Sequence, residues 1–118
     1  MNNSFSDNQP IYGQIVEQIT SEIISGARAP GERIESVREL AIKLRVNPNT
    51  VQRALAELED RKLVETERTN GRFVTTNSRR IEKTRQKIIK QKTTNFLRNI
   101  SQIGIEKDEI IELIKDNY

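Results

Sequence analysis

Residues 36–53 read SVRELAIKLRVNPNTVQR and contain two helix starts that are separated by a short break. Ser36 and Glu39 fit a capping box, in which the Ser hydroxyl and the Glu carboxylate each satisfy a backbone amide that the first helical turn leaves free. Asn47 can cap a second helix, with Pro48 at its first position. Apolar residues recur at helical spacing behind both starts. The stretch therefore predicts two helices joined by a tight turn.

Further elements are predicted on either side of this helix pair. Before the pair, an apolar residue recurs at every fourth position from 11 to 23, which indicates an amphipathic helix. After the pair, residues 63–67 and 72–76 are typical of two short β-strands. The Asn70-Gly71 dipeptide between them is a strong hairpin signal, because both residues tolerate positive φ. Three helices and a hairpin describe a winged helix-turn-helix, so the predicted fold class is mainly α with one small β-hairpin.

The last part of the chain predicts a second, helical unit. Six apolar residues between positions 81 and 103 fall within roughly a 120° arc of a helical wheel, and Gly104 ends that helix before a final short one. The short helix cannot cover the whole arc, so a second copy of the chain is the expected cover. We therefore assign residues 1–78 to the winged helix-turn-helix and residues 79–118 to a C-terminal α-helical hairpin that forms a homodimer. The expected dimer interface consists of Ile88, Ile89, Phe96, Ile100, Ile103, Ile110, Ile111 and Ile114.

The composition excludes several classes of protein. The 118 residues include no Cys and no His, which excludes disulfides, Cys-ligated zinc and the commonest general base. Glu57, Glu59 and Asp60 lie close together only because an exposed helix face is polar. We expect no enzyme, no catalytic residue, no metal and no cofactor. No run approaches the ~20 apolar residues of a membrane helix, and the N-terminus lacks the features of a signal peptide, so we expect a cytoplasmic protein without a membrane partner.

Four polar side chains at the start of the second helix of the pair are candidates for DNA contact. A helix-turn-helix places this end of its second helix in the major groove. Asn49 and Gln52 carry amides that can bind adenine edges, and Arg53 can contact a phosphate or a guanine. Thr50 lies between them. The two residues before Asn49 are better explained as helix caps.

Four ordered motifs resemble the GntR family of bacterial repressors. They cover residues 10–76 at the family's spacing and read Pro10-Ile11-Tyr12, Pro30-Gly31-Glu32-Arg33, Ser36-Val37-Arg38-Glu39-Leu40-Ala41 and Val46-Asn47-Pro48-Asn49-Thr50-Val51. The resemblance implies that Arg38, with Ser36 beside it, contacts the DNA backbone or a base. It also places a wing on Thr69-Asn70-Gly71, whose tip enters the minor groove, with Arg68 and Arg72 flanking the tip as further contacts.

Three residues depart from the family's pattern. Glu35 stands where the family has Pro, and we expect it to loosen the loop before the cap. Gln52 stands where many members have Arg, which changes the expected base preference at that position. Thr69 stands where the wing has Gly, which predicts a stiffer hairpin tip.

About 40 residues are too few for the large effector domain of most members. The short two-helix tail, with Ile103-Gly104-Ile105 followed by DEIIEL at residues 108–113, resembles the YtrA subfamily. Members of that subfamily dimerise through the tail and often lie in operons for ABC-type transporters. The resemblance implies a dimeric repressor of its own operon, with ABC-transporter genes among the expected targets, that binds an inverted-repeat operator in double-stranded DNA. No effector can be named. The alternative is an architectural or protein-interaction winged helix with weak sequence specificity. The balance of 11 acidic against 10 basic side chains over residues 1–78 gives this alternative some support, whereas the polar start of the second helix of the pair and the family resemblance favour the specific repressor.

Overall fold

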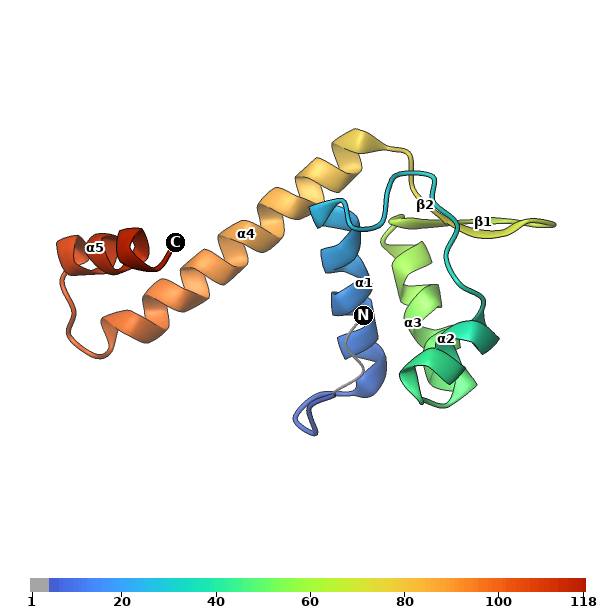
Figure 1. The fold of residues 1–118 in the computed structure, drawn as a ribbon, viewed down its shortest axis with the longest axis horizontal. Helices are drawn as coiled ribbons and strands as arrows, with labels where there is room; N and C mark the ends of the chain where they lie inside the picture. The colour runs from blue at the N-terminus through green and yellow to red at the C-terminus, as the bar shows by residue number, and fades with distance from the viewer. Residues whose placement is uncertain (1–4) are drawn as a thin grey trace. The chain divides into compact units, whose positions relative to one another are not determined.

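The computed structural model describes residues 5–118, which form five helices and two strands (Figure 1). They divide into two compact units, the first ending at Arg85 and the second beginning at Gln86, so the division falls inside the longest helix. The predicted fold class, mainly α with one hairpin, is confirmed. In chain order the elements are α1 (Ile11–Ser25), α2 (Val37–Leu44), α3 (Pro48–Asp60), β1 (Val64–Glu67), β2 (Gly71–Val74), α4 (Ser78–Ser101) and α5 (Lys107–Asn117).

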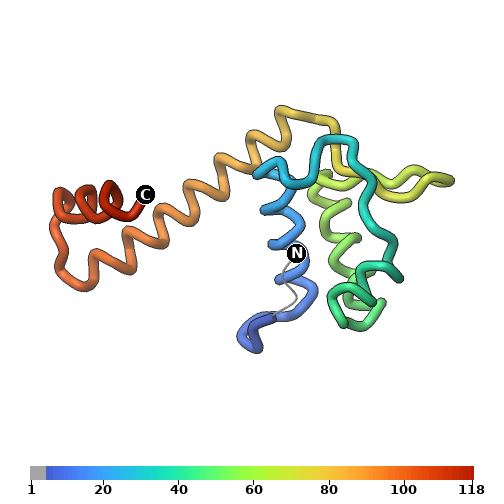
Figure 2. The backbone as a smooth tube through the Cα atoms, viewed as in Figure 1, coloured from blue at the N-terminus to red at the C-terminus, as the bar shows by residue number. Residues whose placement is uncertain are grey.

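The three helices of the first unit each bury one apolar face. In α1 the buried apolar residues recur at four-residue spacing from Ile15 to Ile23, whereas Ile11 at the helix start is exposed. Both α1 and α2 pack against α3, as the tube trace in Figure 2 shows. Burial of these side chains is the main stabilising term of the unit. The largest fully buried side chains are Ile15, Ile19, Ile23, Ile34, Leu40, Leu44, Leu55, Leu58, Leu63, Val16, Val51 and Val74.

Both helix starts of the pair have the predicted caps. The Glu39 backbone amide donates a 3.1 Å hydrogen bond to the Ser36 hydroxyl, and the Ser36 amide donates a 3.2 Å bond to the Glu39 carboxylate. The Asn49 amide donates a 2.7 Å bond to the side-chain oxygen of Asn47. These bonds satisfy amides that a helix N-terminus otherwise leaves free, so they fix where α2 and α3 begin.

The hairpin has a three-residue loop rather than the two-residue turn that an Asn-Gly dipeptide favours. β1 and β2 pair antiparallel, with Glu67 opposite Gly71 and residues 68–70 between them. The Asn70 amide donates to the Glu67 carbonyl and closes the turn. Gly71 has a φ of +102°, but Asn70 does not have a positive φ. The turn therefore uses the positive φ of Gly71 alone, although Asn70 would tolerate one too.

The segment between α1 and α2 adds a short piece of pairing that the sequence did not predict. Arg33 forms an antiparallel bridge with Phe73 of β2. The Ile34 amide donates to the Arg72 carbonyl, and the Val74 amide donates to the Glu32 carbonyl, both at 2.9 Å. The outer edge of β2 is therefore covered by this segment.

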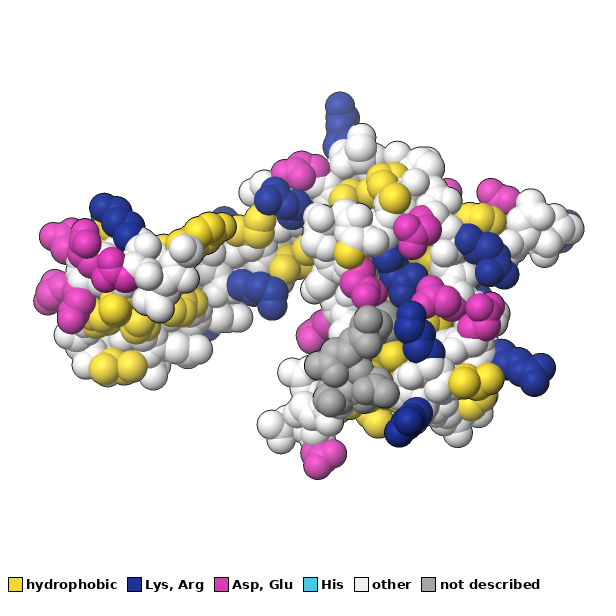
Figure 3. All heavy atoms as spheres, in the orientation of Figure 1, with side chains coloured by type: hydrophobic (Ala, Val, Ile, Leu, Met, Phe, Trp, Pro, Cys, Tyr) yellow, Lys and Arg dark blue, Asp and Glu magenta, His cyan; other side chains and the backbone are white. Residues whose placement is uncertain are grey.

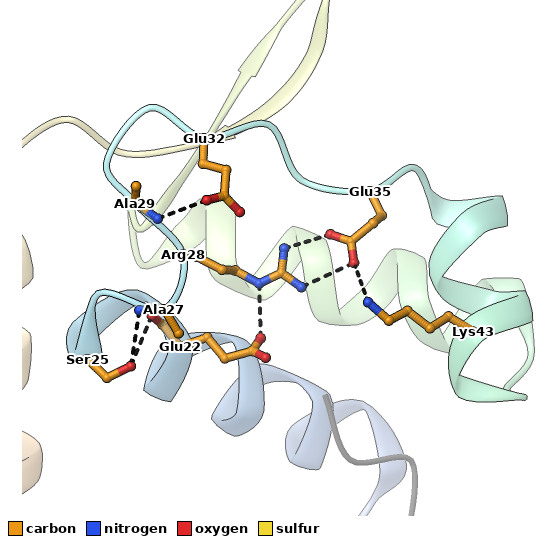
Figure 4. A network of polar contacts seen from close by, with 8 residues as sticks. All are labelled: Glu22, Ser25, Ala27, Arg28, Ala29, Glu32, Glu35 and Lys43. Carbon is orange, nitrogen blue, oxygen red and sulfur yellow. Dashed lines mark hydrogen bonds and ion pairs between the residues drawn. The ribbon is translucent and has the colours of Figure 1, made fainter.

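Glu35 does not loosen the loop before α2, contrary to the sequence-based expectation. Its carboxylate accepts hydrogen bonds from Arg28 at 2.6 and 3.3 Å and from Lys43 at 3.2 Å (Figure 4). Arg28 also donates to Glu22 of α1 at 2.9 Å. The loop is thus tied to α1 on one side and to α2 on the other.

In the second unit, Gly104 ends the long helix as predicted. Its φ is +87°, and its amide donates to the Ser101 carbonyl at 3.1 Å. α5 follows, and its Ile110 is 7% exposed. α4 buries no side chain, so its apolar residues are only partly covered. None of the helices among residues 5–118 has the length and apolar character that crossing a membrane requires.

Candidate nucleic-acid interface

The N-terminal end of α3 presents three of the four predicted polar side chains to solvent. Asn49, Gln52 and Arg53 are exposed, and Thr50 is half-buried. The side chains of Asn49 and Gln52 make no hydrogen bond to another residue of the described chain. The positive end of the helix dipole lies at the same place and favours an anion such as a phosphate. This end of α3 can therefore offer amide groups to base edges and a positive potential to the DNA backbone.

Ser36 and Arg38 lie at the start of α2. Arg38 is exposed, and no carboxylate among residues 5–118 pairs with it. The Ser36 hydroxyl oxygen accepts a hydrogen bond from the Glu39 amide. Hydrogen bonds from Ser36, its backbone amide first, lower the pKa of Glu39 and keep the capping carboxylate charged.

The two arginines of the wing differ in their surroundings. Arg68 is exposed at the hairpin loop and has no carboxylate partner in the described chain. Arg72 donates a 2.6 Å hydrogen bond from Nε to Glu59 of α3, and its side chain is 22% exposed. Asn70 donates to Glu67 at 3.1 Å. Of the predicted wing contacts, Arg68 is thus free to meet a phosphate, whereas Arg72 is engaged within the protein.

Two further arginines near these elements were absent from the prediction. Arg45 is exposed in the turn between α2 and α3, in a left-handed conformation with a φ of 57°. Arg33 is also exposed, and its guanidinium lies 3.6 Å from the point where a Cβ on Gly71 would stand. Their position in short breaks between elements could have drawn attention to them, but hydrophobic periodicity carries no such signal.

Basic and acidic side chains interleave over the first unit, as Figure 3 shows for the visible face. Several arginines are neutralised by a carboxylate, as Arg61 is by Glu57 at 3.4 Å. Arg38, Arg45, Arg53 and Arg68 have no carboxylate partner within the described residues. Residues 1–78 therefore carry unpaired cations on the helix pair and the wing, although their total charge is nearly neutral.

Apolar side chains on the second unit remain exposed. Phe96 is 44% exposed and Ile103 is 81% exposed. Ile88 and Ile100 are half-buried, and Ile110 is already buried within its own chain. Leu97 and Leu113, which the helical-wheel argument left out, are also exposed. The exposed large apolar side chains of the second unit are Ile89, Phe96, Leu97, Ile103, Ile111, Leu113, Ile114 and Tyr118.

Comparison with known proteins covers the first unit and extends over the second. The sequence model of the bacterial regulatory proteins of the gntR family matches residues 11–74. The HTH-type transcriptional regulator YhcF of Bacillus subtilis is 36% identical over 115 residues, which cover 98% of this chain and 95% of YhcF. The HTH-type transcriptional repressor YtrA of the same organism is 33% identical over 108 residues, which cover 91% of this chain and 83% of YtrA.

A solved structure is similar over nearly the whole chain. The GntR family transcriptional regulator from Listeria monocytogenes has a TM-score of 0.90 and 46% identity, and the match covers 97% of this chain and 100% of that one. These relatives are transcriptional regulators rather than enzymes, and they include YtrA, as the short tail led us to expect. The chain belongs to the GntR family of bacterial regulatory proteins and is a DNA-binding transcriptional regulator.

Proposed function

We propose that this chain is a dimeric repressor that binds an inverted-repeat operator, with α3 in the major groove and the hairpin tip in the minor groove. The observation that carries the proposal is the N-terminal end of α3. Asn49 and Gln52 are exposed there with unused amide groups, while the buried face of the same helix anchors it in the core through Val51 and Leu55. A rigid helix that presents uncommitted amides is suited to bind base edges.

Phosphate contacts complete the proposed interface. The exposed and unpaired Arg38 and Arg68 lie on α2 and on the wing, on either side of α3 in the chain. Their charges are not consumed by carboxylates, so each can replace a counterion on the DNA. From the family resemblance, we assign Ser36 and Gly71 to the same interface.

The second unit supports a homodimer. Several apolar side chains of α4 and α5, Phe96 of α4 among them, are only partly covered within this unit. A second copy of the chain would bury them, and a two-fold dimer matches an inverted repeat. We assign residues 79–118 to this role.

The proposed target genes rest on the resemblance to the YtrA subfamily. YtrA carries the name of a repressor, and we extend repression to this chain. The resemblance to its subfamily extends the proposal to control of the chain's own operon, ABC-transporter genes included, and a regulator of bacterial operators works in the cytoplasm. Protection of the promoter upstream of its own gene by the purified protein would support this part of the proposal, and absence of protection would contradict it.

Selection of bound sequences from random DNA tests the interface. The parent should enrich an inverted repeat, and Asn49→Ala or Gln52→Ala should relax the preference at one or two base pairs of each half-site, with a loss of ~1–3 kcal/mol per base contact. Asn95→Ala and Gln102→Ala are matched controls, because both residues are exposed in the second unit. If neither α3 variant changes the enriched sequence, the recognition-helix assignment is wrong.

The same experiment separates the proposal from an architectural winged helix with weak specificity. Such a protein would enrich no motif, and unrelated competitor DNA would displace it as well as the enriched site does. The exposed amides of Asn49 and Gln52 favour specific binding over this alternative, since amides can bind base edges whereas phosphate contacts carry no sequence information.

A further inference from the structure

Tyr12 lies in the first turn of α1 and has no role in the function described so far. Its side chain is half-buried and packs against the core of the first unit. Its ring faces α3, and the Arg53 guanidinium carbon stands 3.8 Å from the ring centroid. No other arginine of residues 5–118 stacks on an aromatic ring in this way. The contact joins a core-anchored residue of α1 to an exposed residue at the start of the recognition helix.

The stack constrains Arg53 without using its hydrogen-bonding groups. A guanidinium over an aromatic face is attracted by the ring quadrupole. Its N–H donors lie in the plane of the group and point outward from its edge, so stacking leaves them free for a phosphate or for the O6 and N7 atoms of a guanine. No carboxylate among the described residues occupies that edge. Arg53 is therefore held but chemically uncommitted.

Fixing the Arg53 side chain before DNA binds should strengthen binding. An exposed Arg has many rotamers, and immobilising it on DNA costs conformational entropy. A side chain that a ring already holds has lost much of this entropy in the free protein, so binding to DNA costs less. Arg38 and Arg68, which are exposed and have no such ring, lack this advantage.

We propose that Tyr12 is a positioning residue that stacks on Arg53 and presents its free guanidinium edge to the operator. The inference deepens the proposed function and rests on it. If Tyr12 only fills space beside the core, its replacement lowers stability and affects DNA binding independently of Arg53. If it positions Arg53, its effect on binding disappears once Arg53 is gone.

A double-mutant cycle distinguishes these two cases. The probe is the inverted repeat enriched from random DNA by the parent, and the four proteins are the parent, Tyr12→Leu, Arg53→Ala and the double variant. We expect Tyr12→Leu to weaken binding by about 3- to 10-fold in the parent and to have no further effect in the Arg53→Ala background. Tyr12→Phe retains the ring and should retain affinity. Tyr12→Leu should also relax base preference at the position that Arg53→Ala relaxes.

A measurement without DNA tests the stack itself. The ring current of Tyr12 should shift the side-chain protons of Arg53 upfield in the NMR spectrum of the parent, and Tyr12→Phe should preserve the shift. Absence of the shift in the parent overturns the inference even if Tyr12→Leu fails to fold. Independent effects of the two substitutions on affinity overturn it as well. If the stack is present but no inverted repeat is enriched, it is the proposed function that fails.

Discussion

Arg28 is 7% exposed, and its Nη1 donates a 2.6 Å hydrogen bond to the Glu35 carboxylate. Glu22 accepts from the same guanidinium at 2.9 Å, and Lys43 donates to Glu35 at 3.2 Å. Four charges from α1, α2 and the loop between them therefore compensate one another around a buried Arg (Figure 4). A buried charge is tolerated only when it is paired in this way, so the network fixes the path of the loop that leads into the helix pair.

Replacing Glu35 with Gln should lower the free energy of unfolding by about 1–3 kcal/mol at neutral pH, because Arg28 loses one of its two carboxylates. Burial alone would raise the pKa of Glu35, but the hydrogen bonds from Arg28 and Lys43 lower it from 4.5 to about 2. A carboxyl with a lowered pKa stabilises the fold above its unfolded value and loses this effect as the pH falls toward the folded value. The difference between parent and variant should therefore be constant above pH ~4.5 and should shrink between ~4.5 and ~2. Urea unfolding at several pH values measures it.

Glu17→Gln is the matched control, since Glu17 is exposed on α1 and has no ion pair in the described chain. It should change stability by a few tenths of a kcal/mol at most. An equal deficit for Glu35→Gln at pH 3 and pH 7 would show that the Glu35 charge does not carry the effect.

The helices and their caps could be predicted because their causes are local. The Ser36 and Glu39 capping box depends on residues three apart in the chain, and the core face of α1 depends on a four-residue repeat. The ion pairs of Glu35 could not be predicted. Its partners Arg28 and Lys43 lie seven and eight residues away and contact it only when the loop folds back. A glutamate in place of a proline gives no hint of that pairing.

In the candidate interface, the exposure of side chains could be predicted from the sequence, but their ion pairs could not. Exposure of Asn49 and Gln52 follows from the helical period that buries Val51 and Leu55. That Arg72 is engaged follows only from the approach of the hairpin to α3, 13 residues away in the chain at Glu59. Sequence spacing therefore predicted which faces are exposed, but it could not show which charges on those faces are already paired.

Arg68 and Arg72 should affect DNA binding differently, although both flank the wing. Arg68 is exposed and unpaired, so Arg68→Ala should reduce the slope of log affinity against log salt concentration by roughly one unit for a lost phosphate contact. Arg72→Ala should leave the slope unchanged and lower stability by up to about 1 kcal/mol, because it breaks the pair with Glu59. Titrations with the selected operator at increasing salt, together with thermal unfolding, measure both. Equal slope changes for the two variants would mean that Arg72 leaves Glu59 to bind DNA.

Lys62 occupies a position that favours glycine. It follows α3 with a φ of 61°, and the Leu63 amide donates back to the Leu58 carbonyl at 3.1 Å, which is the bond of a Schellman C-cap. A residue with a Cβ is strained there, so Lys62→Gly should raise the free energy of unfolding by about 1 kcal/mol. Lys62→Ala, which keeps the strain, should bring no such gain. Chemical denaturation compares the three proteins, and a Gly variant no more stable than the Ala variant would contradict the argument.

Phe96 provides the test of the proposed dimer. It is 44% exposed on α4, among apolar side chains that the second unit covers only in part. A charge placed there would be buried without a partner in a dimer but would be solvated in a monomer. Phe96→Asp should therefore sediment as a monomer at concentrations where the parent is dimeric. It should bind a two-half-site operator weakly while still binding a single half-site, because the first unit is unchanged.

A control variant and a shortened chain complete the test of the dimer. Asn95→Asp adds the same charge at the next exposed position, so a monomer from Phe96→Asp but not from Asn95→Asp identifies the apolar side chain as the cause. A chain ending at Arg85 keeps Ile81, which packs against the core of the first unit, and it should remain folded and monomeric. If Phe96→Asp stays dimeric and binds its operator as the parent does, dimerisation lies outside the apolar side chains of the second unit, and the assignment of residues 79–118 is wrong.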